Sequence, residues 1–295
     1  MSSAQVGAVL RHIRQLATAG KDQDLPDHQL LERFARRRDE AAFAALLRRH
    51  GPMVLGVCRS VLHDVHDAED AFQAAFLLLA QKAGSIHRRE AVSGWLYRVA
   101  YHAAVRARAT AARRRVLERR AVTMPSADPV LDMSLREVRA VLLEELGGLP
   151  EKYRAPVVLC GLEEKSLDEA ARLLGWSRHA VKWRLQRGRE LLRACLRRRG
   201  LELPAALCVT AVALHSSPGR VSAALADATL RAAVKVAAGQ GVSAGLVSAE
   251  VAALVQGASK TMFCGKAEML AVLLLIVGVA AGAFGVVRHR ARAAD

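Results

Sequence analysis

The spacing of apolar side chains indicates helices over most of the chain. Within residues 27–115, apolar residues recur three and four positions apart, as Leu30, Leu31 and Phe34 do at the start of this block. This spacing is typical of a helix with one buried face. A second block with the same periodicity extends over residues 134–200. The pattern therefore predicts an all-α protein.

Residues that cap or interrupt helices refine this prediction. Asp27 is expected to be the N-cap of the first helix. Three pairs are expected to interrupt the first block: Gly51-Pro52, Gly84-Ser85 and Ser93-Gly94. The composition agrees with a helical protein, since 52% of the residues are hydrophobic but only 4% are aromatic, and the chain has 8 prolines. Such a chain is not disordered throughout, and it has less Tyr, Phe, Trp and Thr than a sandwich or barrel would need.

Changes in composition divide the chain into six expected parts. Pro, Ser and Asp gather just before the second block, and small apolar residues replace the charged ones after Pro204. The parts are a leader (1–26), a first helical domain (27–115), a flexible linker (116–133), a second helical domain (134–200), an Ala/Val/Gly-rich extension with no clear repeat or core (201–266), and an apolar helix with a basic tail (267–295).

Nineteen uncharged residues, Met269–Val287, predict a single membrane span near the C-terminus. A helix of that length is about 28 Å long, close to the thickness of the hydrocarbon layer. Lys266 precedes it and Arg288 follows it, and the alternative is a helix buried in the protein. With the N-terminal part inside, the protein would be cytoplasmic and tethered to the inner membrane.

The charge of the chain predicts a polyanionic partner. Lys and Arg number 44 against 28 Asp and Glu, a formal net charge of +16, which suits nucleic acid or an anionic membrane surface. The five cysteines are scattered without a CxxC pair, as is usual in a reducing compartment. His63 and His66 have the spacing of half a metal site, but with no further ligand nearby they are interpreted as solvated histidines.

The first group of residues with a functional interpretation is an acidic helix start. Between Arg59 and Lys82 there is no Lys or Arg, and carboxylates gather before an apolar helix: Asp64, Asp67, Glu69 and Asp70. Their position complements the helix dipole, which explains it without a function. The helix would bury Phe72, Phe76 and Leu79 and leave Asp70 and Gln73 exposed. In a basic protein, such an acidic face also suits a basic protein partner.

Two further groups point to nucleic acid. The segment Trp95–His102 interleaves aromatic and basic residues and continues into an arginine-rich stretch over residues 106–120, a composition that suits base stacking and phosphate contacts. The alternative is that its aromatics are core and its arginines a solvated face. The second group begins with Ser166 and Glu169 at capping-box spacing. Gly175 then provides a turn, and Ser177 can cap a strongly basic helix over residues 178–199. This arrangement predicts a helix-turn-helix rather than a generic helical hairpin.

In this order and spacing, the three groups resemble a bacterial sigma factor of the extracytoplasmic-function (ECF) type over residues 27–200. HDAEDAFQAAF at residues 66–76 is similar to the family's helix that docks on core RNA polymerase. SGWLYRVA at 93–100 is similar to the signature that precedes the minus-ten-reading helix. LPEKYR at 149–154, followed by the helix-turn-helix, is similar to the domain that reads the minus-thirty-five element.

The resemblance implies two small helical sigma domains and three sets of binding residues. Contacts with core polymerase are expected from Asp67, Glu69, Asp70 and Gln73. Minus-ten DNA contacts are expected from Arg88, Trp95, Tyr97, Arg98, His102 and Arg106. Minus-thirty-five DNA contacts are expected from Ser177, Arg178, His179, Lys182, Trp183, Arg184 and Arg187. The implied partners are core RNA polymerase, promoter DNA and, as a further candidate, an anti-sigma factor. No catalytic, metal or cofactor site is expected, because the polymerase supplies the chemistry.

Departures from the family and rival functions complete the sequence-based picture. His102 and Ala103 stand where the family often has Asn or Asp, and Trp183 replaces a small residue. The C-terminal extension of this chain resembles those of planctomycete-like members of the family. One rival function is a membrane-tethered helix-turn-helix regulator that acts without polymerase. Another is a membrane scaffold whose arginines meet anionic lipid, and the acidic helix argues against it.

Overall fold

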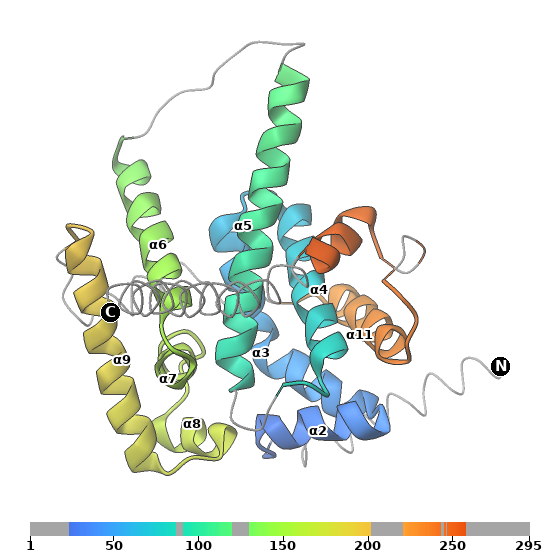
Figure 1. Ribbon diagram of the computed structural model, residues 1–295, viewed down its shortest axis with the longest axis horizontal. Helices are drawn as coiled ribbons and strands as arrows, with labels where there is room; N and C mark the ends of the chain where they lie inside the picture. Colours follow the sequence, from blue (N-terminus) through green and yellow to red (C-terminus); the bar gives the residue numbers. More distant parts are fainter. Residues whose placement is uncertain are drawn as a thin grey trace, which may run out of the picture. The chain divides into compact units, whose positions relative to one another are not determined.

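The computed structural model describes residues 24–86, 91–119, 130–201, 221–242, 245 and 247–257. Within these residues every regular element is a helix, as predicted (Figure 1). By its internal contacts the chain forms two units, Met1–Val255 and Gln256–Asp295. All the helices discussed below have their packing residues in the first unit.

Four helices build the first bundle: α2 (Asp27–Arg37), α3 (Glu40–Val61), α4 (Val65–Lys82) and α5 (Val92–Arg119). In Figure 1 the long helix α5 runs beside α3 and α4, and it packs against both. The centre of the bundle holds a chain of aromatic rings, each in contact with the next: Phe34, Phe43, Phe76 and Phe72. The apolar face expected for this block is therefore the core of the bundle.

Two expected breaks are wrong, and one expected cap is displaced. Helix α3 runs through Gly51-Pro52 without interruption, because residues on both sides of the pair are buried and their packing outweighs the local preference. Helix α5 begins at Val92 and continues through Ser93-Gly94. The N-cap of α2 is Pro26, and Asp27 lies inside the first turn. The break at Gly84-Ser85 is confirmed, since α4 ends at Lys82.

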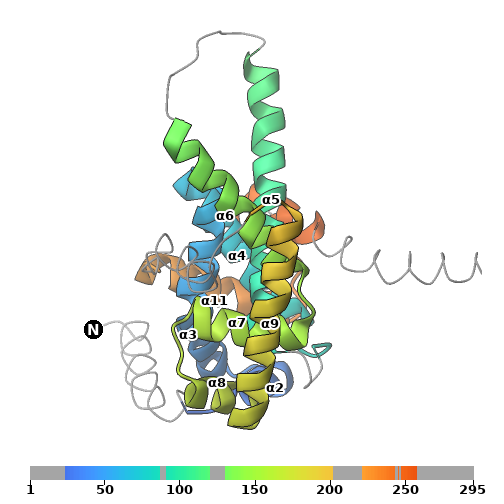
Figure 2. The ribbon, with the colours of Figure 1, turned by 90° about the vertical axis from the view of Figure 1, so that its left-hand side faces the viewer.

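The second block contains α6 (Val130–Gly148), α7 (Glu151–Gly161), α8 (Leu167–Leu174) and α9 (Arg178–Arg198). Helix α9 packs against α7, and Figure 2 shows α8 near one end of α9. The approach of α7 and α9 depends on Gly188. A Cβ atom at this position would lie 2.9 Å from both the backbone oxygen of Tyr153 and Cγ2 of Val157.

The two blocks pack against each other through α5 and α7. Arg154 of α7 is buried and donates to the backbone oxygens of Gly94 (3.1 Å), Gly147 (2.7 Å) and Leu149 (2.9 Å), and it also pairs with Glu151. Three of these partners belong to the second block, and Gly94 belongs to α5. The arginine therefore joins the two blocks through satisfied hydrogen bonds in a buried position.

Part of the C-terminal extension packs on the first bundle, which the sequence pattern did not predict. Helix α11 (Ala223–Ala237) begins at Ser222, whose side chain accepts a hydrogen bond from the Leu225 backbone, and it packs against α4 and α3. A further short helix covers residues 249–257. In Figure 1, α11 and α9 lie on opposite sides of α5. The extension thus adds to the core of the first bundle.

The predicted membrane span lies elsewhere in the chain. Met269–Val287 falls outside the described residues. Among the helices that the structure describes, none is long and apolar enough to cross a membrane.

Candidate functional site

The acidic start of α4 has the local structure that its sequence predicts. Asp64 is the N-cap, and its carboxylate accepts hydrogen bonds from the backbone nitrogens of His66 (2.8 Å) and Asp67 (3.0 Å). These bonds satisfy two of the amide groups that a helix leaves free at its start. The cap fixes where the helix begins, and so it sets the face on which the following carboxylates lie.

The residues expected to contact polymerase are half-buried rather than exposed. Asp67, Glu69, Asp70 and Gln73 all have intermediate exposure. The Asp70 carboxylate accepts a hydrogen bond of 3.1 Å from the hydroxyl of Ser248, in the C-terminal extension. Burial raises the pKa of Asp70 above its usual value, and the negative charges of Glu250 and Asp67 add to this rise while the Ser248 hydrogen bond opposes it.

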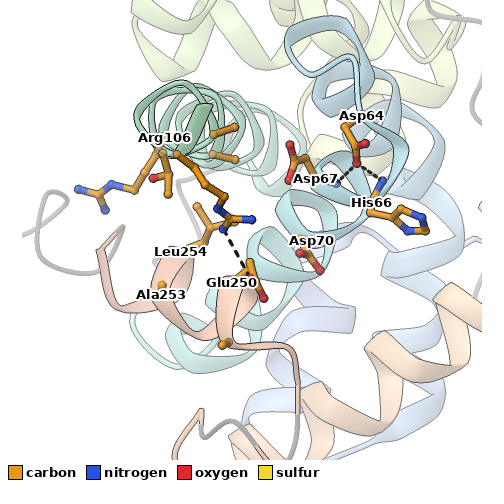
Figure 3. Close-up of a pocket in the computed structure, with 13 residues that line it drawn as sticks. Asp64, His66, Asp67, Asp70, Arg106, Glu250, Ala253 and Leu254 are labelled. Carbon is orange, nitrogen blue, oxygen red and sulfur yellow. Dashed lines mark hydrogen bonds and ion pairs between the residues drawn. The ribbon is translucent and has the colours of Figure 1, made fainter. Parts of the chain in front are cut away.

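A cavity of about 640 Å³ opens between this acidic start, the middle of α5 and the short helix at 249–257 (Figure 3). Figure 3 shows Asp64, Asp67 and Asp70 on one side and Arg106 on the other. Glu250 lies 3.6 Å from Arg114 of α5. The C-terminal extension therefore contributes one wall of a cavity whose other walls belong to the two helices with predicted binding roles.

The minus-ten set divides into an accessible face of α5 and a buried residue. Arg98 and His102 are exposed, and Trp95 and Arg106 are half-buried. These four positions are separated by three, four and four residues, which places them on one face of the helix. Partial desolvation by the surrounding protein lowers the pKa of His102 below its usual value, and the positive charges of Arg98 and Arg154 lower it further.

Tyr97 lies apart from that face. Its side chain is fully buried, and its hydroxyl donates a hydrogen bond of 2.9 Å to the backbone oxygen of Leu143 in α6. In this structure Tyr97 thus packs between the two blocks and does not present its ring to DNA. Arg88, the remaining member of the expected set, lies outside the described residues.

The helix-turn-helix geometry is confirmed. Ser166 and Glu169 form a complete capping box at the start of α8, and Gly175 ends this helix with a left-handed backbone (φ +66°) that glycine adopts without strain. Ser177 then caps α9 by accepting a hydrogen bond of 3.2 Å from the Ala180 backbone. Helices α8 and α9 pack against each other across this three-residue turn.

Helix α9 presents a basic, solvent-exposed stripe. His179, Lys182, Trp183 and Arg187 are exposed, and the Trp183 side chain is 56% exposed, unusual for so large an apolar group. Gln186 belongs to the same stripe by its exposure and its helical spacing, although the sequence analysis did not single it out.

All three arginines of the expected minus-thirty-five set are held by neighbours. The Arg184 guanidinium lies 4.0 Å from the centre of the Trp176 ring, a cation–π contact. Arg178 lies 3.3 Å from the Asp168 carboxylate. Arg187 donates a hydrogen bond of 3.0 Å to the Glu190 carboxylate. All three arginines therefore have partners within the protein, while Lys182 is exposed on the same helix.

A buried charged cluster connects the first bundle to the loop before α8. His50 is fully buried, with Nε2 3.1 Å from Asp27 and Nδ1 2.8 Å from Glu163. Although burial opposes it, the charges of Glu163 and Asp27 raise the pKa of His50 to about 10. The sequence analysis missed this cluster, since Glu163 is 113 residues from His50 and no local pattern links them.

Comparison with known proteins covers the helices that carry these residues. The chain matches sigma-70 region 2 over residues 46–114 and sigma-70 region 4 over residues 139–192. The first match contains the acidic start of α4 and the exposed face of α5, and the second contains α8 and most of α9. Both matches end before residue 193, so the extension lies beyond them.

Individual relatives are similar over the same part of the chain. The chain is 33% identical over 175 residues to the ECF RNA polymerase sigma factor SigW of Bacillus subtilis, which is 54% of this chain and 91% of the relative. It is 32% identical over 160 residues to SigM of Mycobacterium tuberculosis (52% and 76%), and 33% identical over 175 residues to the RNA polymerase sigma factor CarQ of Myxococcus xanthus (59% and 99%). On this evidence the chain belongs to the ECF family of RNA polymerase sigma factors, which direct the initiation of transcription.

Proposed function

We propose that this sigma factor holds core RNA polymerase with the acidic start of α4 and contacts promoter DNA with α5 and α9. The observation that carries the proposal is the pairing of two surfaces of opposite character in one chain. One is a run of carboxylates on α4, and the other is the exposed basic stripe of α9 at a helix-turn-helix. An acidic face repels DNA, so it suits a protein partner, whereas a basic recognition helix suits the major groove.

Polymerase docking is assigned to Asp67, Glu69, Asp70 and Gln73. Support comes from their common place on the first turns of α4 and from the absence of Lys and Arg between Arg59 and Lys82. Charge complementarity of this kind contributes mainly to specificity and to the rate of association.

Minus-ten DNA is assigned to the face of α5 that carries Trp95, Arg98, His102 and Arg106, together with Arg88. The exposure of Arg98 and His102 supports contacts with backbone phosphates, and Trp95 provides a ring on which an unpaired base can stack. Tyr97 is assigned here to the contact between α5 and α6, because of its burial and its bond to Leu143.

Minus-thirty-five DNA is assigned to the N-terminal half of α9, with Ser177, Arg178, His179, Lys182, Trp183, Arg184 and Arg187. The exposed members are accessible on the surface of α9, which suits insertion into the major groove, and the Trp183 ring lies 6.3 Å from that of Tyr153 in α7. Arg184 and Arg178 would exchange their present neighbours, Trp176 and Asp168, for DNA on binding.

The decisive experiment reconstitutes initiation with purified components. Full-length protein and core polymerase are tested for complex formation and for promoter-specific transcripts, beside the variant with Asp67→Lys and Asp70→Lys. We expect the double variant to lose complex formation while its circular dichroism is unchanged. Asp227→Lys, at an exposed position of α11, is the control for charge. Unreduced binding by the double variant would remove the docking assignment. DNA binding without any polymerase complex would favour the free-standing regulator.

A membrane anchor at Met269–Val287 is a second proposal, and it rests on the sequence alone. The segment holds nineteen uncharged residues, and each Arg placed at its centre would cost about 2.5–3.5 kcal/mol on insertion. This anchor would keep a cytoplasmic protein at the inner membrane. Fractionation of the full chain beside the variant with Leu274→Arg and Val277→Arg tests it. Alkali-resistant membrane association that the variant loses would support the anchor, and an equal distribution of the two proteins would refute it.

A further inference from the structure

Helix α4 is buried on every side over its second half. Seven consecutive residues, 74–80, are all buried. Since each residue of a helix turns by about 100°, seven consecutive positions cover the whole circumference. The partners that pack on α4 are α3, α5 and α11. One strip of α4 is therefore covered by the C-terminal extension rather than by the bundle itself.

Helix α11 makes this contact with a single apolar face. Its buried residues are Leu225, Thr229, Ala232, Ala233, Val236 and Ala237, and their spacing places them on one side of the helix. The hydroxyl of Thr229 donates to the Leu225 backbone oxygen at 2.7 Å, so no polar group is left unsatisfied in that face. Just before α11, Val221 lies against Gly51, where a Cβ atom would be 3.2 Å from Cγ2 of Val221.

A second contact of the extension lies directly on the acidic start of α4. Ser248 donates to Asp70 at 3.1 Å, and the same hydroxyl oxygen caps the short helix at 249–257 by accepting from the Val251 backbone. Val251 is fully buried, and Leu254 and Val255 are nearly so. This helix thus binds with apolar residues while its Ser248 end occupies a carboxylate.

The contact through α11 and the contact through Ser248 differ in character, and this difference allows the extension to be displaced from α4. Three of the six residues that α11 buries are alanines, which offer little apolar area for each residue. At the other end, Glu250 faces Asp70 across the cavity, and its charge helps to raise the pKa of that carboxyl. Like charges held near each other oppose the contact. Glu250 also pairs with Arg114 at 3.6 Å, but both side chains are exposed, and an exposed ion pair contributes little. Asp70 would therefore gain from exchanging Glu250 for a basic partner.

We propose that residues 221–242 and 247–255 form an intramolecular cover on α4 that core polymerase must displace in order to dock. The proposal rests on the assignment of polymerase docking to the start of α4. The occupant in the free protein is the extension, which hydrogen-bonds to Asp70 and buries the neighbouring strip of the same helix. The extension would then set how strongly this sigma factor competes for polymerase.

Two matched substitutions in α11 test the cover in the full-length protein. Ala233→Glu places a carboxylate at a fully buried position against the bundle, and Ala224→Glu makes the same change at an exposed position. If displacement of the cover opposes docking, Ala233→Glu binds core polymerase more tightly, by about 5- to 150-fold as is usual for coupled sites. Ala224→Glu binds as the wild type does. Circular dichroism is used to check that both variants retain their helices.

The outcomes separate this proposal from the docking assignment. If the wild type binds core polymerase and a folded Ala233→Glu variant binds no more tightly, the cover is refuted and the docking assignment stands. If neither protein binds core polymerase, the cover and the docking assignment are both refuted. Should Ala233→Glu fail to fold, Ser248→Ala combined with Leu254→Ala replaces it, with tighter binding again expected and unchanged binding again refuting the cover.

A second measurement follows the cover itself. Hydrogen exchange of the α11 amides is compared in the free protein and in the complex with core polymerase. Displacement predicts at least a tenfold faster exchange in α11 within the complex, because the helix loses its packing. Unchanged or slower exchange would show that α11 stays on α4 when polymerase binds, and it would overturn the proposal.

Discussion

Replacing His50 by alanine should strongly destabilise the protein. The imidazolium lies between Asp27 and Glu163, at 3.1 and 2.8 Å, and all three side chains are almost completely buried. Without His50, the carboxylate of Glu163 loses its buried cationic partner, and Asp27 keeps only Arg49. Removing one member of a buried ion pair costs about 3–5 kcal/mol.

The pKa of His50 gives a second measure of the same effect. Its rise from 6.5 to about 10 corresponds to about 5 kcal/mol, since each pH unit is worth about 1.4 kcal/mol. Because the folded pKa is above the unfolded value, this stabilisation is complete below pH 6.5 and is lost as the pH rises through about 10. The wild type should therefore exceed His50→Ala in stability by several kcal/mol at pH 6, and by much less at pH 10.

Urea unfolding followed by circular dichroism measures both quantities, with His179→Ala as the control. His179 is exposed on α9, so its replacement should change the free energy of unfolding by less than about 0.5 kcal/mol. A loss of under about 1 kcal/mol for His50→Ala at pH 7 would refute the reasoning. So would a difference between wild type and variant that stays constant from pH 6 to pH 10.

Three further predictions concern the second block. Gly188→Ala should lower the free energy of unfolding by about 1–3 kcal/mol in urea titrations, because its Cβ would meet the Tyr153 backbone at 2.9 Å; equal stability would contradict the close packing of α7 and α9. Ser166→Ala should cost about 1 kcal/mol in the same assay by removing the capping box, and no loss would mean that the box contributes nothing. Lys182→Ala should weaken promoter binding uniformly and reduce its salt dependence by about one counterion. Trp183→Ala should leave the free energy of unfolding unchanged and alter promoter preference in a binding panel. If Lys182→Ala altered the preference and Trp183→Ala weakened binding uniformly, the two roles would be exchanged.

Features that depend on neighbouring residues were predictable from the sequence. The capping box at Ser166, the turn at Gly175 and the cap at Ser177 use backbone and side-chain groups within three residues of one another. Their chemistry is therefore visible in a short window of sequence. The same holds for Asp64, whose carboxylate binds amides two and three residues away.

Features that depend on distant residues were not predictable in the same way. Pro52 lies within α3 because the surrounding bundle holds this helix together, which no local rule registers. Nothing in the segment Trp95–His102 indicates that Tyr97 is buried, yet α6 covers it. The Ala-rich sequence of α11 has too little contrast between its faces to reveal which one is buried. These positions are decided by tertiary packing, for which sequence periodicity is a weak guide.

The hydrogen bonds of Arg154 have a consequence for the way in which the two sigma regions can separate. Of its four partners, only the Gly94 oxygen belongs to region 2, while Gly147, Leu149 and Glu151 move with region 4. Opening the contact between α5 and α7 would therefore leave the guanidinium bound on its own side, and one carbonyl would turn to water. The contact between the two regions can therefore open and close without reordering the arginine side chain that makes it.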